Sequence, residues 1–112
     1  MSDLLGKKCV PCEIGSGVKP VDRKAVAALL GEVPGWELSA DAKTITRAFR
    51  LKNFVEAMDF INRVAALAEN EGHHPDIHVF YNKVTLELST HAIGGLSEND
   101  FILAAKINEL AH

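Results

Sequence analysis

The segment from residue 53 to residue 72, NFVEAMDFINRVAALAENEG, has the strongest helical periodicity in the chain. Asn53 followed by Glu56 is a capping box, and Gly72 is a typical C-terminal cap. An apolar stripe is predicted at helical spacing through Phe54, Met58, Ile61, Ala65 and Ala68. A long helix with one apolar face needs a surface to cover, and we expect that surface to be a sheet.

Strand patterns flank the predicted helix on both sides. Residues 36–51 indicate two short strands joined by a polar turn, because Ile45 and Phe49 alternate onto one face. Arg47 falls on that same face and interrupts the apolar alternation. Residues 76–90 predict a hairpin whose apolar members recur at every second position. These members are Ile77, Val79, Tyr81, Val84, Leu86 and Leu88.

Two shorter helices complete the predicted fold. Asp22 is a candidate N-cap for a helix that ends near Gly31, and Ser97 with Asp100 forms a capping box for the last helix. The predicted order is helix, strand, strand, helix, strand, strand, helix. This order indicates an α+β fold, in which three helices pack on one face of a four-stranded antiparallel sheet.

The length of 112 residues fits a single domain. We expect residues 1–20 to form a flexible N-terminal arm and residues 21–112 to form the domain. Within the arm, Cys9 and Cys12 form a C-x-x-C pair, but the sequence has no second cysteine pair to complete a structural zinc site. An incidental, reduced pair is the favoured interpretation. A metal or redox role stays open, and no chemistry is assigned to the pair.

The charge distribution argues against several classes of partner. The net charge is -3, and the 12 Lys and Arg residues are scattered, so nucleic-acid binding has little support. The sequence contains no apolar stretch long enough for a membrane span, and its start lacks the hydrophobic core of a signal peptide. A cytoplasmic protein is therefore expected.

The predicted hairpin brings distant histidines together. A tight turn at Asn82 and Lys83 would pair Val79 with Leu86. Carried past the strand ends, this register sets His74 opposite His91. Ile77 would then pair with Leu88, so that the apolar residues of both strands share one face.

A carboxylate is expected to join these histidines. Glu69 lies in the last turn of the long helix and near its predicted apolar stripe, where the helix dipole disfavours a negative charge. We therefore predict that Glu69, His73, His74 and His91 converge on one cleft. Paired imidazoles beside a carboxylate suit general acid and base catalysis, such as the elimination of water, without a covalent intermediate.

The spacing of these residues carries a resemblance to a known family. The pattern extends over more than thirty positions, and the neighbouring strings YNKV, LST and GLSE share it. Its members here are Glu69, His73, His74, Pro75, Tyr81, His91 and Asp100. This pattern resembles the signature of the pterin-4a-carbinolamine dehydratases, from about the first predicted helix to the last.

The resemblance implies an activity and roles for the residues. It implies dehydration of a 4a-hydroxytetrahydropterin to a quinonoid dihydropterin, with no metal and no cofactor. His73 and His91 would be the proton-transfer pair, His74 would bind or polarise the pterin, and Glu69 would set the charge of its neighbours. It also implies a homodimer or homotetramer, and an aromatic amino acid hydroxylase is a possible partner.

Alternatives and departures remain beside this interpretation. Three histidines and a carboxylate could bind zinc or iron, although adjacent His73 and His74 would normally diverge. A binding role is the second alternative, because some animal relatives act as dimerisation cofactors of a transcription factor. Animal members tend to have an acidic residue and an aromatic residue where this chain has Gly72 and Ile77, which leaves the identity of the pterin open. Asp100 is interpreted mainly as a helix cap.

Overall fold

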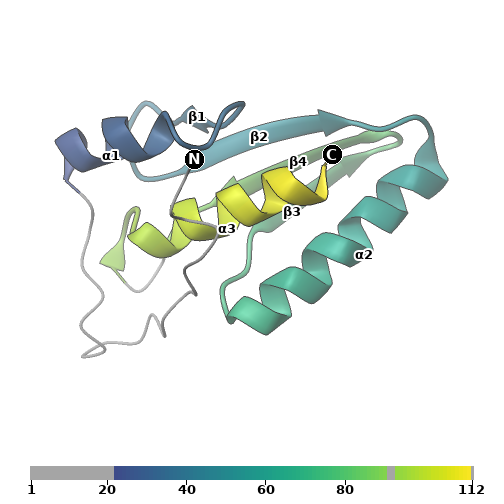
Figure 1. The fold of residues 1–112 in the computed structure, drawn as a ribbon. Helices are drawn as coiled ribbons and strands as arrows, with labels where there is room; N and C mark the ends of the chain where they lie inside the picture. Colours follow the sequence, from purple (N-terminus) through teal and green to yellow (C-terminus); the bar gives the residue numbers. More distant parts are fainter. Residues whose placement is uncertain (1–21, 91–92, 112) are drawn as a thin grey trace.

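The computed structural model describes residues 22–90 and 93–111, which form three helices and four strands (Figure 1). The helices are α1 (Arg23–Leu30), α2 (Phe54–Glu71) and α3 (Glu98–Leu110). The strands are β1 (Glu37–Leu38), β2 (Ile45–Arg50), β3 (Asp76–Phe80) and β4 (Lys83–Leu88). The element order and the α+β fold class are confirmed. The predicted arm, with Cys9 and Cys12, and also His91 lie outside the described residues.

The four strands form one antiparallel sheet in the order β1-β2-β4-β3. Helices α2 and α3 lie side by side against one face of this sheet (Figure 1). Most residues of α3 are buried, as expected for a helix that is apolar around most of its circumference. The core between these layers contains Val26, Val33, Trp36, Ile45, Phe49, Phe60, Val64, Val84, Leu86, Leu88, Phe101 and Leu103.

The buried stripe of α2 differs from the predicted one. The buried positions are Ala57, Phe60, Val64, Ala68 and Glu71. The predicted residues Phe54 and Met58 are exposed, and of the predicted stripe only Ala68 is fully buried. The apolar residues of α2 cover more than one face, so periodicity alone does not decide which face packs on the sheet. Phe60 faces the core, where its ring centroid lies 4.9 Å from that of Phe49.

The predicted register of the hairpin is wrong by two residues. Ile77 pairs with Leu86, and Val79 pairs with Val84, so the turn consists of Tyr81 and Asn82. Tyr81 takes a positive φ of 55°. The Asn82 side chain donates a hydrogen bond to Leu51 O, while the backbone carbonyl of Asn82 accepts from the Leu51 N–H. This anchoring to the start of the β2-α2 connection fixes the position of the turn. A shift by two residues keeps every side chain on its predicted face.

A polar cluster explains the arginine on the apolar face of β2. Arg47 donates hydrogen bonds to Asn108 Oδ1 and Pro34 O, and its guanidinium lies 4.4 Å from the Phe49 ring centroid. The Trp36 indole N–H donates to the same Asn108 oxygen at 2.9 Å. Burial lowers the pKa of the Arg47 guanidinium. The cluster therefore ties the loop before β1 to the C-terminal end of α3.

Candidate active site

The candidate site begins where α2 ends. Gly72 ends the helix in the left-handed conformation with a φ of 70°, which is strained for a residue with a β-carbon. The Gly72 N–H donates to Ala68 O and Glu69 O, and the His73 N–H donates to Ala68 O as well. This cap holds His73 in a fixed relation to the last turn of α2.

His73 and Asp100 form a buried pair at the centre of the site. His73 is 7% exposed, and its Nε2 atom lies 2.6 Å from Asp100 Oδ1. The other carboxylate oxygen of Asp100 accepts hydrogen bonds from the Thr90 hydroxyl and the Ser97 backbone N–H, each at 2.9 Å. A carboxylate only accepts, so Nε2 of His73 carries the proton of this bond. In the neutral ring the lone pair then lies on Nδ1.

His74 and Glu69 form a second pair, which is exposed. The His74 Nε2 atom lies 2.6 Å from Glu69 Oε1, and the two side chains are 58% and 80% exposed. The expectation that Glu69 lies near the buried stripe is wrong. The buried stripe passes through Ala68, and one residue corresponds to a rotation of about 100° around the helix, which turns Glu69 toward solvent.

The buried carboxylate at the end of α2 is Glu71. Its Oε2 atom lies 2.8 Å from Lys106 Nζ, and the side chains of Glu71 and Lys106 are 4% and 18% exposed. The predicted apolar stripe did not include Glu71 because its side chain is charged. The signal that could have found it is its spacing, since it lies seven residues after Val64 and three after Ala68.

Asp100 has a larger role in the site than the sequence indicated. It accepts from the Ser97 N–H as part of the predicted capping box, and it also binds His73. The observed strand register supports this grouping, because its continuation sets His73 opposite Thr90, and both bind Asp100. The same continuation sets His74 opposite Ser89 and not opposite His91. His91 itself lies outside the described residues.

A hollow of about 270 Å³ adjoins the site at Thr90. Its other lining residues are Asp41, Lys43, Thr44, Ser89, Gly94 and Gly95. The hydrogen bond from the Ser39 hydroxyl is the main cause that lowers the pKa of Asp41, so this carboxylate keeps its charge. Within residues 22–90 and 93–111, no three His, Cys, Asp or Glu side chains are arranged to hold a metal ion. The described part also contains no helix long and apolar enough to cross a membrane.

The arrangement of His73 and Asp100 has the geometry of an oriented acid or base. A buried carboxylate behind an imidazole fixes the tautomer of the ring and stabilises the imidazolium that forms when the ring takes a proton. His74, on the next residue, presents a second imidazole to solvent. The described part of the site can therefore orient one imidazole for proton transfer and hold another at the surface.

Comparison with known proteins identifies the family. The model of the family described as pterin 4 alpha carbinolamine dehydratase matches residues 19–110. The chain is 51% identical over 113 residues to pterin-4-alpha-carbinolamine dehydratase 2, mitochondrial, of Arabidopsis thaliana. This alignment covers 98% of the chain and 60% of the Arabidopsis protein, so the chain spans less than two thirds of that relative.

Two solved structures share the fold. The crystal structure of a transcriptional coactivator/pterin dehydratase from Brucella melitensis is 32% identical, with a TM-score of 0.80, and the match covers 84% of this chain and 100% of that one. A pterin dehydratase-like protein, described as a RuBisCO assembly factor in the alpha-carboxysome, is 23% identical with a TM-score of 0.60. That match covers 71% of this chain and 93% of the other, and it shows the fold alone. The resemblance found in the sequence, and with it the prediction of a dehydratase, is confirmed by the family match. This chain belongs to the pterin 4 alpha carbinolamine dehydratase family.

Proposed function

We propose that this protein dehydrates a 4a-hydroxytetrahydropterin to a quinonoid dihydropterin and water, as a step of tetrahydropterin recycling. The observation that carries the proposal is the buried contact of 2.6 Å between His73 Nε2 and Asp100 Oδ1. Both residues of this contact lie within residues 19–110, which the model of the pterin 4 alpha carbinolamine dehydratase family matches.

The reaction needs one acid and one base. The 4a-hydroxyl group leaves C4a as water after it takes a proton, and the proton on N5 departs as the C4a=N5 double bond forms. One proton is given and one is taken, so the turnover leaves the total number of protons on the enzyme unchanged. A His73 ring held by Asp100 suits the acceptance of the N5 proton, because the carboxylate stabilises the imidazolium.

The remaining site roles stay predictions. His91 would be the second member of the proton-transfer pair, and His74 would bind or polarise the pterin. Glu69, at 2.6 Å from His74 Nε2, would orient that ring. The exposure of His74 and Glu69 supports contact with a ligand that arrives from solvent.

The decisive experiment follows the loss of enzymatically generated 4a-hydroxytetrahydrobiopterin in chelator-treated buffer. We expect the wild type to accelerate this loss and His73→Ala to lose about 10²- to 10⁴-fold of the rate. Lys24→Ala is the control, because Lys24 is exposed on α1, outside the candidate site and outside the proposed interface on β3. Equal rates for wild type and His73→Ala would contradict the proposal. A wild-type rate that returns only when zinc or iron is added would favour the alternative of a metal site.

We also propose a homodimer or homotetramer. Strand β3 is an edge strand, and all five of its residues are exposed. Large apolar side chains are exposed on this strand, on the turn after it and on the start of α2. They are Phe54, Val55, Met58, Ile77, Val79, Phe80 and Tyr81. Exposed apolar surface beside an open sheet edge is typical of a protein interface.

Light scattering after size-exclusion chromatography tests the oligomer. A mass of two or four times 12.2 kDa is expected. The double variant Val79→Lys, Phe80→Lys should lower that mass, because lysine blocks strand pairing at an edge. A wild-type protein that runs at 12.2 kDa would contradict the proposal.

A binding role is the second candidate function. The Brucella melitensis structure is described both as a transcriptional coactivator and as a pterin dehydratase. The test is to introduce His73→Ala into cells that lack this protein. The variant would restore the lost function if the role is binding, but not if the role is catalytic. We expect that it does not restore the function.

The cellular setting completes the proposal. We propose a cytoplasmic protein whose substrate is supplied by an aromatic amino acid hydroxylase, whereas the Arabidopsis relative is named mitochondrial. Fractionation of the source cells tests the location. Co-purification, or a faster coupled hydroxylase reaction in the presence of this chain, tests the partner.

A further inference from the structure

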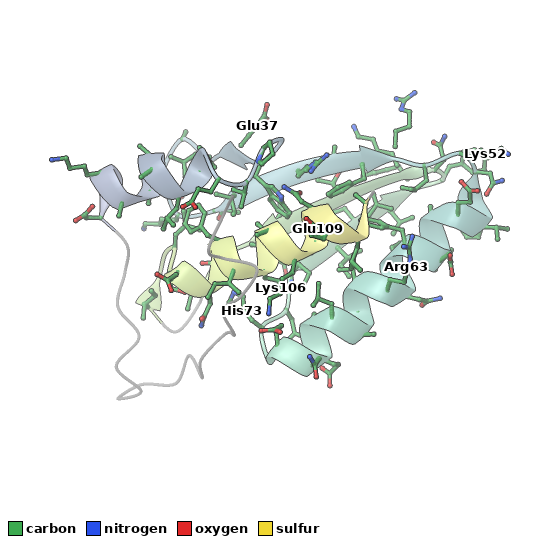
Figure 2. The ribbon with its side chains drawn as sticks, viewed as in Figure 1. Glu37, Lys52, Arg63, His73, Lys106 and Glu109 are labelled. Atoms are coloured by element: carbon green, nitrogen blue, oxygen red, sulfur yellow. The ribbon has the colours of Figure 1, made fainter. Side chains whose placement is uncertain are left out.

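We propose that Lys106 is a positioning residue for His73 and acts through its buried ion pair with Glu71. The inference rests on the proposed dehydratase function and deepens it. Neither Lys106 nor Glu71 belongs to the residue spacing that carries the family resemblance. In the view of Figure 2, the labelled residues His73 and Lys106 both lie between α3 and the C-terminal end of α2.

The ion pair between Lys106 and Glu71 joins α3 to the end of α2 and is largely buried. Lys106 Nζ lies 2.8 Å from Glu71 Oε2, and the two side chains are 18% and 4% exposed. Loss of one partner from a largely buried ion pair is destabilising. The two side chains are therefore held together, and α3 fixes the last residue of α2.

The cap of α2 transmits this fixation to His73. Glu71 is followed by Gly72, whose N–H is bonded to Ala68 O at 2.9 Å, and the His73 N–H is bonded to the same oxygen at 3.2 Å. With Gly72 in the left-handed conformation, no freely rotating segment lies between Glu71 and His73. A displacement of Glu71 therefore displaces His73 as well.

Two points on α3 hold this end of α2. Asp100 binds the His73 ring, and Lys106 binds Glu71 six residues further along the same helix. At 1.5 Å per residue, these two points are about 9 Å apart along α3. A single point would let the capped turn rotate around it, whereas two separated points fix both its position and its orientation.

Lys106 also balances the charge at the site. Three carboxylates lie around the two histidines: Glu69 beside His74, Asp100 beside His73, and Glu71 two residues before His73. In the structure, Lys106 pairs with Glu71 at 2.8 Å. Asp100 is the carboxylate that contacts the His73 ring, at 2.6 Å.

The test compares Lys106→Met with Lys83→Met, the matched control on the exposed end of β4. Two readouts are needed: the kinetics of 4a-hydroxytetrahydrobiopterin dehydration, and the NMR signal of the His73 Nε2 proton, which is protected because the ring is buried. For Lys106→Met we expect kcat to fall about tenfold or more with little change in KM, and the Nε2 proton signal to move or broaden. Lys83→Met should match the wild type in both. An unchanged kcat and an unchanged His73 signal in Lys106→Met would overturn the inference, even if stability falls.

A second variant keeps the test valid if Lys106→Met does not fold. Glu71→Gln retains an oxygen that accepts from Lys106 Nζ but removes the ion pair. We expect the same direction in both readouts, and an unchanged His73 signal in Glu71→Gln would sink the inference. The NMR readout needs no substrate. It therefore still judges the positioning role if the wild type has no dehydratase activity, which would instead contradict the proposed function.

Discussion

The two adjacent histidines each contact a carboxylate at the same distance, but in different environments. His73 and His74 each place Nε2 at 2.6 Å from a carboxylate oxygen. The first pair, with Asp100, is almost fully buried, whereas the second pair, with Glu69, is mostly exposed. Water screens an exposed pair and competes for its hydrogen bonds, so equal distances do not imply equal strength.

The difference follows from what holds each carboxylate. Asp100 lies in the first turn of α3 and accepts from Thr90 and Ser97 in addition to His73. Glu69 lies on the solvent side of α2, and its carboxylate is at the end of an exposed side chain. A catalytic ring needs a fixed geometry, so we propose His73 for proton transfer and His74 for contact with a ligand.

The largest effect is expected from a substitution that breaks the buried pair of His73 and Asp100. Asp100→Asn should lower kcat by about 10²- to 10⁴-fold, because an amide can present N–H groups to His73 Nε2 and disturb the tautomer. Loss of hydrogen bonds should also lower the free energy of unfolding by about 1–3 kcal/mol. Dehydration kinetics and urea unfolding measure the two effects. Asp59→Asn, at an exposed carboxylate on α2, is the control and should match the wild type.

A smaller effect is expected when the exposed ring is removed. His74→Ala should raise KM several-fold more than it lowers kcat, because the ring is predicted to contact the pterin rather than to transfer the proton. Its stability should stay within about 0.5 kcal/mol of the wild type, as is usual for surface substitutions. Steady-state kinetics at several pterin concentrations measures the changes in KM and kcat separately. A loss in kcat as large as that of Asp100→Asn would remove the distinction between the two histidines.

A still smaller effect is expected at the exposed carboxylate. Glu69→Gln should change kcat/KM by less than about fivefold, because an exposed pair contributes up to about 1 kcal/mol. The amide oxygen can still accept a hydrogen bond from His74. Activity assays at low and high salt measure the effect, which should shrink as salt screens the wild-type pair. A hundredfold loss would show that Glu69 acts as strongly as a buried carboxylate.

The smallest expected effect concerns an exposed carboxylate outside both pairs. The pKa of Asp41 is lowered from 3.8, chiefly by the hydrogen bond from the Ser39 hydroxyl. The unfolded state therefore binds this proton at a higher pH than the folded state, so the stabilisation is present above about pH 4 and is lost as the pH falls. Urea unfolding of wild type and Asp41→Asn should differ slightly near pH 7 and converge at low pH. A difference that grows in acid would reverse the sign of this linkage.

Much of the fold could be predicted from the sequence because its signals are local. The caps at Asp22, Asn53 and Gly72 confirm the predicted bounds of the first two helices, since capping depends on residues three or four positions apart. The hairpin register depends on a contact between Asn82 and Leu51, which lie 31 positions apart. Such a contact leaves no periodic pattern, so the turn was predicted one residue too late.

For the candidate site, the sequence indicated which residues lie near one another better than it indicated their contacts. The spacing indicated His73, His74 and Glu69, and the structure pairs the last two in an exposed position. Asp100 was interpreted mainly as a helix cap because its capping partner, Ser97, is three positions away, whereas His73 lies 27 positions away. The pairing of Glu71 with Lys106 gave no signal, because two opposite charges 35 positions apart follow no local pattern.

The polar cluster around Asn108 has a practical consequence for studies of folding. Trp36 is the only tryptophan in the chain, it is 4% exposed, and its indole N–H is bonded to the last turn of α3. Its fluorescence should therefore report the release of the C-terminal end of α3, the end opposite Asp100. Unfolding followed by fluorescence and by the His73 NMR signal would show whether the two ends of this helix detach together or in sequence.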